Sequence, residues 1–292
     1  MALFDSTFLS KLEYLSLVSR RVFRGSLLAQ RRTMQFGSGI EFADHREYAA
    51  GDDLRYLDWN VYARHGEYLL KRFQEEQDLH VYFLLDCSRS MAFGQPAKFD
   101  LARQLVAALA YIALADLERI AVVAFADRII ANFPLTRGKA RILSLLDFLE
   151  QLEPQGADTN VAQSMQEFLR RKQRNGLAVV VSDLFAPGGY EAGIDQLRHR
   201  RYEPHIIQLH DRREAEPDFL GDVELYDVES YAGRKVTVTE ANLRAYRRIF
   251  QEYHERIATY CRNYGLGCTQ ATTQIPFDDL VLRMMRTAGA LT

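Results

Sequence analysis

Short apolar runs that end in polar residues recur along the chain from residue 79 onward. They are 81–85 (VYFLL), 120–125 (IAVVAF), 177–181 (LAVVV) and 205–209 (HIIQL). Runs of this length that are apolar almost throughout are typical of strands covered on both faces, as in a parallel sheet. We therefore expect these four segments to be buried strands.

Between and after these runs, apolar residues recur at helical spacing. The segments with this pattern are 98–117, 139–152, 161–171, the stretch after the turn at 187–189 to about 201, 242–264, and the end of the chain from 278. A short strand at 266–270 and an edge strand or hairpin at 128–133 are also expected. The alternation predicts an α/β fold with a doubly wound, mostly parallel sheet over residues 79–292. Alternating residues at about 213–240, around Ala232-Gly233, predict a β-hairpin insertion.

The chain before residue 79 has two further parts. Residues 1–36 carry leucines near helical spacing and many arginines, which predicts an N-terminal helical segment that is solvated or faces a partner. Residues 37–78 combine glycine turns with several aromatic residues, including the only tryptophan, Trp59. A disordered linker rarely carries so many aromatic residues, so we expect an ordered, irregular wrap whose aromatic side chains are buried against the core. Pairs of arginine and carboxylate should hold it, with Arg46, Arg55 and Arg64 facing Asp52, Asp53 and Asp58.

Composition and charge narrow the class of protein. The 292 residues have a formal net charge of −2 and 48% hydrophobic residues, as in an ordinary globular protein. No apolar run approaches the roughly 20 residues of a membrane-spanning helix, so no integral membrane segment is expected. The order of charges at the N-terminus is wrong for a secretory signal. Cys87, Cys261 and Cys268 are too few and too scattered for a disulfide framework or a zinc site, which favours the cytoplasm.

Candidate chemistry follows the predicted strands. Asp86 ends the first strand, and Ser88 and Ser90 follow at alternate positions, so their side chains can converge in an extended loop. Thr159 and Asp183 lie on later loops that parallel topology brings to the same edge of the sheet. Carboxylate and hydroxyl oxygens suit a hard cation, Mg²⁺ or else Mn²⁺ or Ca²⁺. The alternative is structural, because an Asp followed by serines can simply cap the next helix or form a local turn.

In this order the residues resemble the metal-ion-dependent adhesion site of the von Willebrand factor A fold. DCSRS (86–90), the Thr of GADTN (156–160) and the Asp of VVSDLF (180–185) match its pattern. The stretches GSGIEF (37–42), HREYAAGDDLRYLDWNVYAR (45–64) and KRFQEE (71–76) resemble domain-of-unknown-function family 58, a bacterial branch with a von Willebrand A-like core. The resemblance implies a partner of the MoxR-type AAA+ ATPase class and a chaperone-like role in assembly or maturation of a protein complex. Many relatives carry N-terminal membrane helices, which we do not expect in this chain.

We therefore expect a non-enzymatic, metal-dependent module that binds an acidic residue of a partner protein, in the cytoplasm or at the inner membrane through its partners. The alternative is a Mg²⁺-dependent phosphoryl-transfer hydrolase with Asp86 as nucleophile. Against it, position 88 is a serine where a second catalytic carboxylate would be needed, and no lysine looks placed to steady a phosphoryl group. No histidine pair on a helix face forms a metal site, and Cys87 should pack beneath the loop. Nucleic-acid binding through the arginines of 1–36 and 198–201 is the weakest alternative, because solvated faces often carry such runs.

Overall fold

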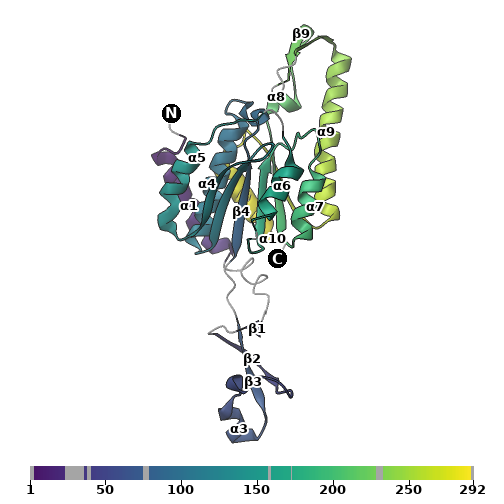
Figure 1. The fold of residues 1–292 in the computed structure, drawn as a ribbon. Helices are drawn as coiled ribbons and strands as arrows, with labels where there is room; N and C mark the ends of the chain where they lie inside the picture. The colour runs from purple at the N-terminus through teal and green to yellow at the C-terminus, as the bar shows by residue number, and fades with distance from the viewer. Residues whose placement is uncertain are drawn as a thin grey trace.

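The computed structural model describes residues 3–23, 36–37, 41–74, 79–156, 159–171, 173–227 and 233–290. Its centre is a six-stranded sheet in the order β11-β8-β7-β4-β5-β6 (Figure 1). The strands are β4 (His80–Asp86), β5 (Arg119–Phe125), β6 (Ile129–Arg137), β7 (Leu177–Ser182), β8 (Glu203–His210) and β11 (Gly267–Thr272). Neighbouring strands are parallel except for β5 and β6. The predicted α/β fold with a doubly wound, mostly parallel sheet is confirmed.

Strand order explains how the two halves of the sheet meet. The chain runs outward from β4 through β5 to the edge strand β6, then returns to place β7 on the other side of β4 and continues through β8 to β11. The strand order therefore reverses between β4 and β7. Open α/β sheets bind their ligands at the carboxyl ends of the strands at such a reversal.

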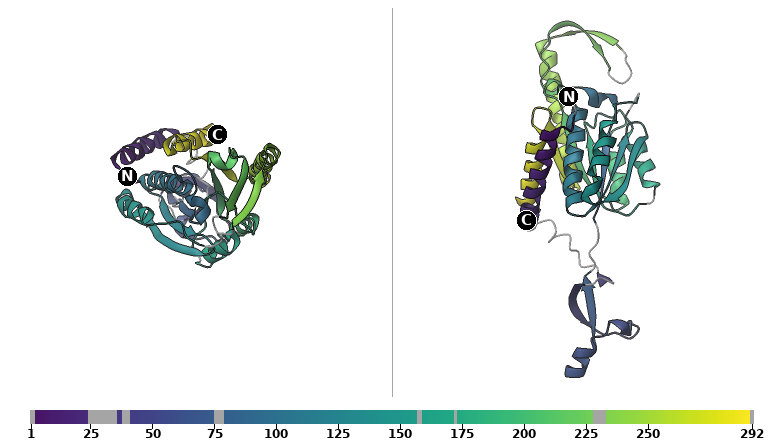
Figure 2. Two further views of the ribbon diagram at one scale, coloured as in Figure 1. Left: turned by 90° about the horizontal axis from the view of Figure 1, so that it is seen from above. Right: turned by 90° about the vertical axis from the view of Figure 1, so that its left-hand side faces the viewer.

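Helices cover both faces of the sheet (Figures 1 and 2). They are α4 (Lys98–Ala115), α5 (Ile142–Glu150), α6 (Val161–Leu169), α7 (Glu191–His199), α9 (Glu240–Asn263) and α10 (Phe277–Ala290). All seven residues of β4 are buried. Phe83 on one face packs in a core with residues of α4, α5 and α10, and Tyr82 on the other face packs with residues of α6, α7 and α9. The continuous apolar run in β4 thus supplies two separate cores.

The first helix, α1 (Ser6–Phe23), belongs to the main domain. It packs against α4 and α10, with Phe8, Leu12 and Leu15 in the core. Lys11 forms a 3.0 Å ion pair with Asp278 of α10. The predicted helix is therefore present over residues 6–23, but its apolar face covers this chain's own core, and residues 24–35 lie outside the described part.

Residues 36–74 correct the expectation of an irregular, buried wrap. They contain a small antiparallel sheet of β1 (Phe36–Gly37), β2 (Glu41–Glu47) and β3 (Leu69–Gln74), with a 3₁₀ turn (Leu54–Tyr56) and the helix α3 (Trp59–His65). Figures 1 and 2 show this unit apart from the main sheet, on the side where β4 begins. Trp59 is 60% exposed, and Leu57 and Leu70 are buried apolar side chains among those whose burial is described. The predicted burial of the tryptophan is wrong, because the segment builds a small core of its own.

Two of the expected ion pairs in this unit are present. Arg46 lies 2.5 Å from Asp52, and Arg55 lies 2.6 Å from Asp53. The third carboxylate, Asp58, accepts hydrogen bonds from backbone N–H groups at the start of α3 and lies 3.0 Å from His45, so the expected pairing with Arg64 is replaced. Asp58 acts mainly as a helix cap.

The predicted hairpin insertion is also confirmed. After β8, the short helix α8 (Arg212–Ala215) leads into the antiparallel strands β9 (Gly221–Tyr226) and β10 (Gly233–Val238). We call α8, β9 and β10 the hairpin arm; its strands and the start of α9 project beyond the sheet in Figure 1. Among the described residues, no helix combines the length and the apolar character needed to cross a membrane.

Candidate metal centre

The carboxyl ends of β4 and β7 bring two buried carboxylates to the point where the strand order reverses. Leu85 pairs with Val181 in the parallel register, so Asp86 at the end of β4 lies beside the Ser182-Asp183 end of β7. Asp86 is 0% exposed and Asp183 is 1% exposed. The hydroxyl of Ser182 donates a 2.5 Å hydrogen bond to Oδ2 of Asp86. Burying two carboxylates away from water costs free energy unless a cation or hydrogen bonds compensate their charges.

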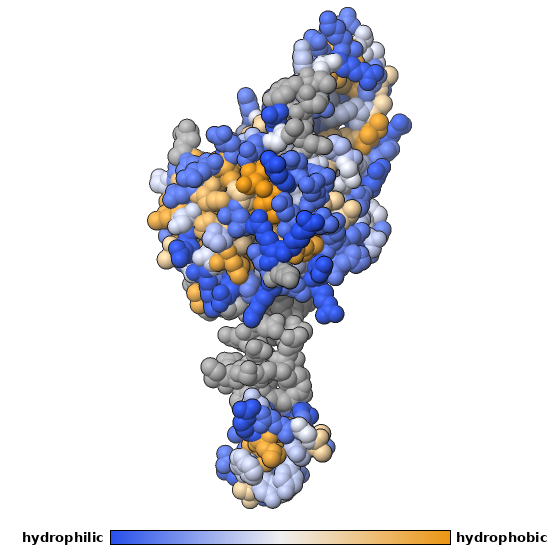
Figure 3. All heavy atoms as spheres, in the orientation of Figure 1, coloured by the Kyte–Doolittle hydropathy of each residue, from blue (hydrophilic) through white to orange (hydrophobic). Residues whose placement is uncertain are grey.

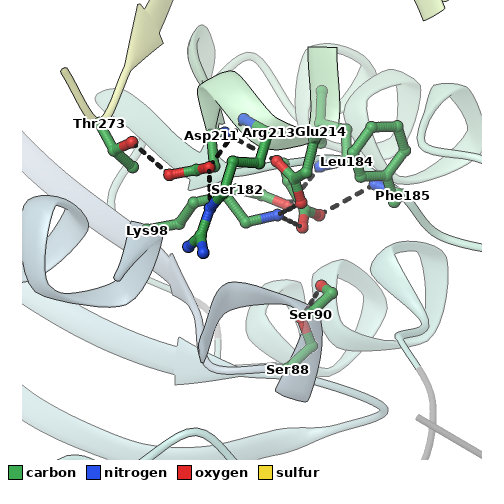
Figure 4. Close-up of polar contacts among 11 residues, drawn as sticks. Ser88, Ser90, Lys98, Ser182, Leu184, Phe185, Asp211, Arg213, Glu214 and Thr273 are labelled. Carbon is green, nitrogen blue, oxygen red and sulfur yellow. Dashed lines mark hydrogen bonds and ion pairs between the residues drawn. The ribbon is translucent and has the colours of Figure 1, made fainter. Parts of the chain in front are cut away.

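The loop after β4 turns two hydroxyls toward each other. The backbone N–H of Ser88 donates to Oδ1 of Asp86 at 2.8 Å, and the Oγ atoms of Ser88 and Ser90 lie 3.0 Å apart (Figure 4). Ser88 precedes a 3₁₀ turn (Arg89–Ala92) but makes no side-chain capping bond there, and the residue that precedes α4 is Ala97. Of the structural alternative, the helix-capping part is absent from these serines, whereas the local-turn part is present, because the carboxylate of Asp86 accepts a hydrogen bond from the N–H of Ser88.

Thr159 lies on the loop between α5 and α6 and is 2% exposed. This loop rests on the ends of β4 and β5, because Gln155 N–H donates to the carbonyl of Cys87 at 2.7 Å and Asn160 N–H to the carbonyl of Ala126 at 3.0 Å. Asn160, not Thr159, caps α6 through its side chain. Thr159 is thus a buried hydroxyl at the same edge as Asp86.

A residue that sequence reasoning missed lies at the centre of the site. Lys98, the first residue of α4, has a fully buried side chain whose ammonium lies 2.7 Å from Oδ2 of Asp183 and 2.5 Å from Oε1 of Glu214 (Figure 4). Sequence reasoning finds no lysine placed to steady a phosphoryl group, and Lys98 is instead engaged by two carboxylates of the protein itself. The signal in the sequence is the lysine that opens a mostly apolar helix. Its partners could not be found, since they lie 85 and 116 residues away.

The charges of these groups influence one another strongly. Burial, and then the nearby Asp183, raise the pKa of Asp86 to about 7. Burial alone would lower the pKa of Lys98, but Asp183 and Glu214 together raise it above its ordinary value. Burial raises the pKa of Glu214 despite its contact with Lys98. With all four groups ionised, three carboxylates and one ammonium carry a formal charge of −2, which a divalent cation would balance.

The donor set fits a hard cation better than a soft one. Two carboxylates and three hydroxyls are oxygen ligands of the kind that Mg²⁺ prefers. Over the described ranges, no group of three or more His, Cys, Asp and Glu side chains is arranged to hold a metal, so any cation here would depend on the hydroxyls and on water. Cys87 is fully buried beneath the loop, as expected, and burial raises the pKa of its thiol.

Fold and site together define an α/β protein with a doubly wound sheet and two buried carboxylates at its reversal of strand order. A family model described as "Protein of unknown function DUF58" matches residues 44–257, and the chain belongs to this family. Uncharacterized proteins of Mycobacterium tuberculosis and Mycobacterium bovis are each 25% identical over 265 residues, covering 89% of this chain and 83% of the relative.

Solved structures that match this chain include BatB from Bacteroides thetaiotaomicron, with 14% identity and a TM-score of 0.46. An aerotolerance-related membrane protein from Bacteroides fragilis has 15% identity and the same TM-score. Each alignment covers 73% of this chain and 100% of the other.

Proposed function

We propose that this protein is a non-enzymatic binding module that docks a partner protein through a divalent cation. Asp86, Ser88, Ser90, Thr159 and Asp183 would hold the cation. The observation that carries the proposal is the pair of carboxylates, Asp86 and Asp183, buried beside hydroxyl groups at the reversal of strand order. The bound cation would supply a Lewis-acidic position that a carboxylate from a partner can ligate.

The chain's own residues would set the strength of this contact. Asp86 and Asp183 supply two negative charges, whereas Ser88, Ser90 and Thr159 supply oxygen atoms without charge. Such a set neutralises a divalent ion without surplus, which leaves it receptive to one more acidic ligand. Docking would then be directional and reversible by chelation.

Protein binding is favoured over phosphoryl transfer by the residues around Asp86. The residue two positions on is Ser88, where a phosphoryl-transfer enzyme of this kind needs a second carboxylate as acid or base. Lys98 is fully buried between two carboxylates, so it does not reach an incoming phosphoryl group. Mg²⁺-dependent turnover of a generic phosphoester that disappears in Asp86→Asn would overturn this choice.

The metal site itself is tested by calorimetry with Mg²⁺ and Mn²⁺. Wild-type protein should bind one divalent ion with modest affinity, since Mg²⁺ keeps several waters in such sites. Asp86→Ala should bind none, whereas the control Asp218→Ala, at an exposed position, should bind as the wild type does. Equal binding by wild type and Asp86→Ala would eliminate the site.

We further propose that the partner is a MoxR-type AAA+ ATPase, or a client on which both proteins act in chaperone-like assembly. The family resemblance supports this choice. The complex should form in Mg²⁺, dissociate in EDTA, and be lost in Asp86→Ala and in Thr159→Ala without loss of fold. A complex that survives all of these changes would place the contact elsewhere, with the arginine-rich residues 1–36 as the next candidate. The three free cysteines support a cytoplasmic location, with contact to a membrane only through partners.

A further inference from the structure

Lys98 joins the candidate metal centre to the hairpin arm through an unbroken series of polar contacts. Its ammonium bridges Asp183, at the end of β7, and Glu214 of α8. Glu214 in turn accepts a 2.7 Å hydrogen bond from the backbone N–H of Asp211, and Asp211 accepts one of 2.7 Å from the hydroxyl of Thr273. Figure 4 shows the side chains of Lys98, Asp211, Glu214 and Thr273 converging from separate elements. The series therefore spans the ends of three strands and the first residue of α4.

Both oxygens of Asp183 already accept a hydrogen bond in this arrangement. Its Oδ1 atom accepts a 3.0 Å hydrogen bond from the N–H of Phe185, and its Oδ2 atom accepts the bond from Lys98. The Lys98 ammonium also lies 5.6 Å from the centre of the Phe185 ring. A cation that takes Asp183 as a ligand must compete with Lys98 for this carboxylate. Lys98 thus acts as an internal positive charge that opposes a second one nearby.

Glu214 gives Lys98 an alternative partner, and this partner is part of the hairpin arm. One oxygen of Glu214 binds Lys98 and the other closes the capping box at the start of α8. The strands that follow are mostly exposed, and an isolated two-stranded hairpin is only marginally stable. The first helix of the arm is therefore held in part by the Lys98–Glu214 ion pair, in which the lysine side chain is fully buried.

We propose that Lys98 is a positioning residue that exchanges Asp183 for the bound cation and thereby couples occupancy of the metal centre to the hairpin arm. The proposal rests on the metal-dependent function given above. When a cation engages Asp183, the Lys98 ammonium is left to Glu214 alone, and the base of α8 is held more tightly. Thermodynamic linkage makes this coupling reciprocal. A bound cation strengthens the binding of a partner to the arm by some factor, and that partner strengthens cation binding by the same factor.

Four proteins test this coupling: wild type, Lys98→Met, Glu214→Gln and the double variant. Mg²⁺ affinity is measured by calorimetry, and the order of the arm by hydrogen exchange of amides in α8, β9 and β10. In the wild type, saturating Mg²⁺ should slow exchange in the arm. Lys98→Met should bind Mg²⁺ roughly tenfold more tightly or better, because a nearby positive charge is removed, yet its arm should not respond.

Glu214→Gln should bind Mg²⁺ more weakly than the wild type, because Lys98 then depends on Asp183 alone, and its arm should not respond. The double variant keeps the formal charge of −2 and frees Asp183. It should bind Mg²⁺ at least as tightly as the wild type, and hydrogen exchange in its arm should not change when Mg²⁺ binds. This variant also carries the test if Lys98→Met, which leaves two buried carboxylates without their cation, fails to fold.

The outcomes separate this proposal from the one on which it rests. A wild-type protein that binds no divalent ion would overturn both. Mg²⁺ binding with an arm whose exchange is unchanged would overturn only the coupling. A folded Lys98→Met or double variant that binds Mg²⁺ more weakly than the wild type would show that Lys98 supports the site structurally, and would overturn its role as a competitor.

Discussion

The Ser182 hydroxyl links Asp86 to the loop that follows β7. It donates a 2.5 Å hydrogen bond to Oδ2 of Asp86 and accepts one of 2.8 Å from the N–H of Leu184. Leu184 has a left-handed backbone with φ of 61°, which is costly for a branched residue and is kept only where surrounding contacts enforce it. One hydroxyl thus orients a candidate metal ligand and fixes an unfavourable turn.

Ser182→Ala should lower the free energy of unfolding by about 1–3 kcal/mol, because a buried carboxylate oxygen and a buried N–H both lose their partner. In a domain of this size the melting temperature should fall by roughly 2–10 °C. Thermal unfolding followed by circular dichroism checks this value. Ser10→Ala, at an exposed helical position, is the control and should change little. A Ser182→Ala protein as stable as this control would show that the bonds to Ser182 contribute nothing.

Gly176, just before β7, is a second position where the backbone leaves no room. A Cβ atom at this residue would lie 2.1 Å from the carbonyl oxygen of His80, whereas one at Gly188 would meet no atom within 4 Å. Gly176→Ala must therefore push β7 away from β4, and its midpoint of urea unfolding should fall markedly. Gly188→Ala should unfold close to the wild type. Similar midpoints for the two variants would contradict the close approach of these strands.

Trp59 reports on the small antiparallel unit. Because it is 60% exposed, Trp59→Ala should change the free energy of unfolding by no more than about 0.5 kcal/mol. As the only tryptophan, it should also emit at the wavelength of a water-exposed indole. Leu70→Ala, which removes a buried side chain of the same unit, should cost about 2–5 kcal/mol of that unit's stability. A blue-shifted tryptophan emission, or a large loss of unfolding free energy in Trp59→Ala, would show instead that Trp59 is buried against the core.

His205 on β8 should make stability depend on pH. Burial lowers its pKa to about 4, below the value of about 6.5 in an unfolded chain. Between pH 6.5 and 4 the unfolded state therefore binds more protons, so the free energy of unfolding falls as the pH falls through this window. His205→Gln should flatten the slope by at most about 1 kcal/mol per pH unit, as measured by urea unfolding. The exposed control His199→Gln should keep the slope, and an unchanged slope in His205→Gln would refute the assignment.

The strands of the main sheet could be predicted because each one is specified by its own short run of residues. The run from Val81 to Leu85 must be covered on both faces, and the polar residues at its end mark the carboxyl edge. The same locality explains the error at Trp59, since aromatic content predicts order but not what the aromatic residues pack against. Here Leu57 and Leu70 are buried, whereas the tryptophan is exposed.

The candidate site could be predicted only in part for a related reason. Asp86, Ser88 and Ser90 are neighbours in the sequence, and the parallel topology brings Asp183 beside them. The roles of Lys98 and Glu214 arise from contacts between α4, β7 and α8, which no spacing or periodicity encodes. Buried ion pairs of this kind can be recognised only once the packed structure is known.

The antiparallel strand β6 has a consequence for how copies of this protein behave at high concentration. Within the described sheet it is hydrogen-bonded only to β5, so its other side offers backbone groups to any passing strand. Pro134 lies within β6, next to a shift in its register with β5. A proline supplies no N–H, and a bulge bends the strand, so both discourage another chain from extending the sheet. The edge strand β6 therefore both completes the main sheet and disfavours aggregation through that edge.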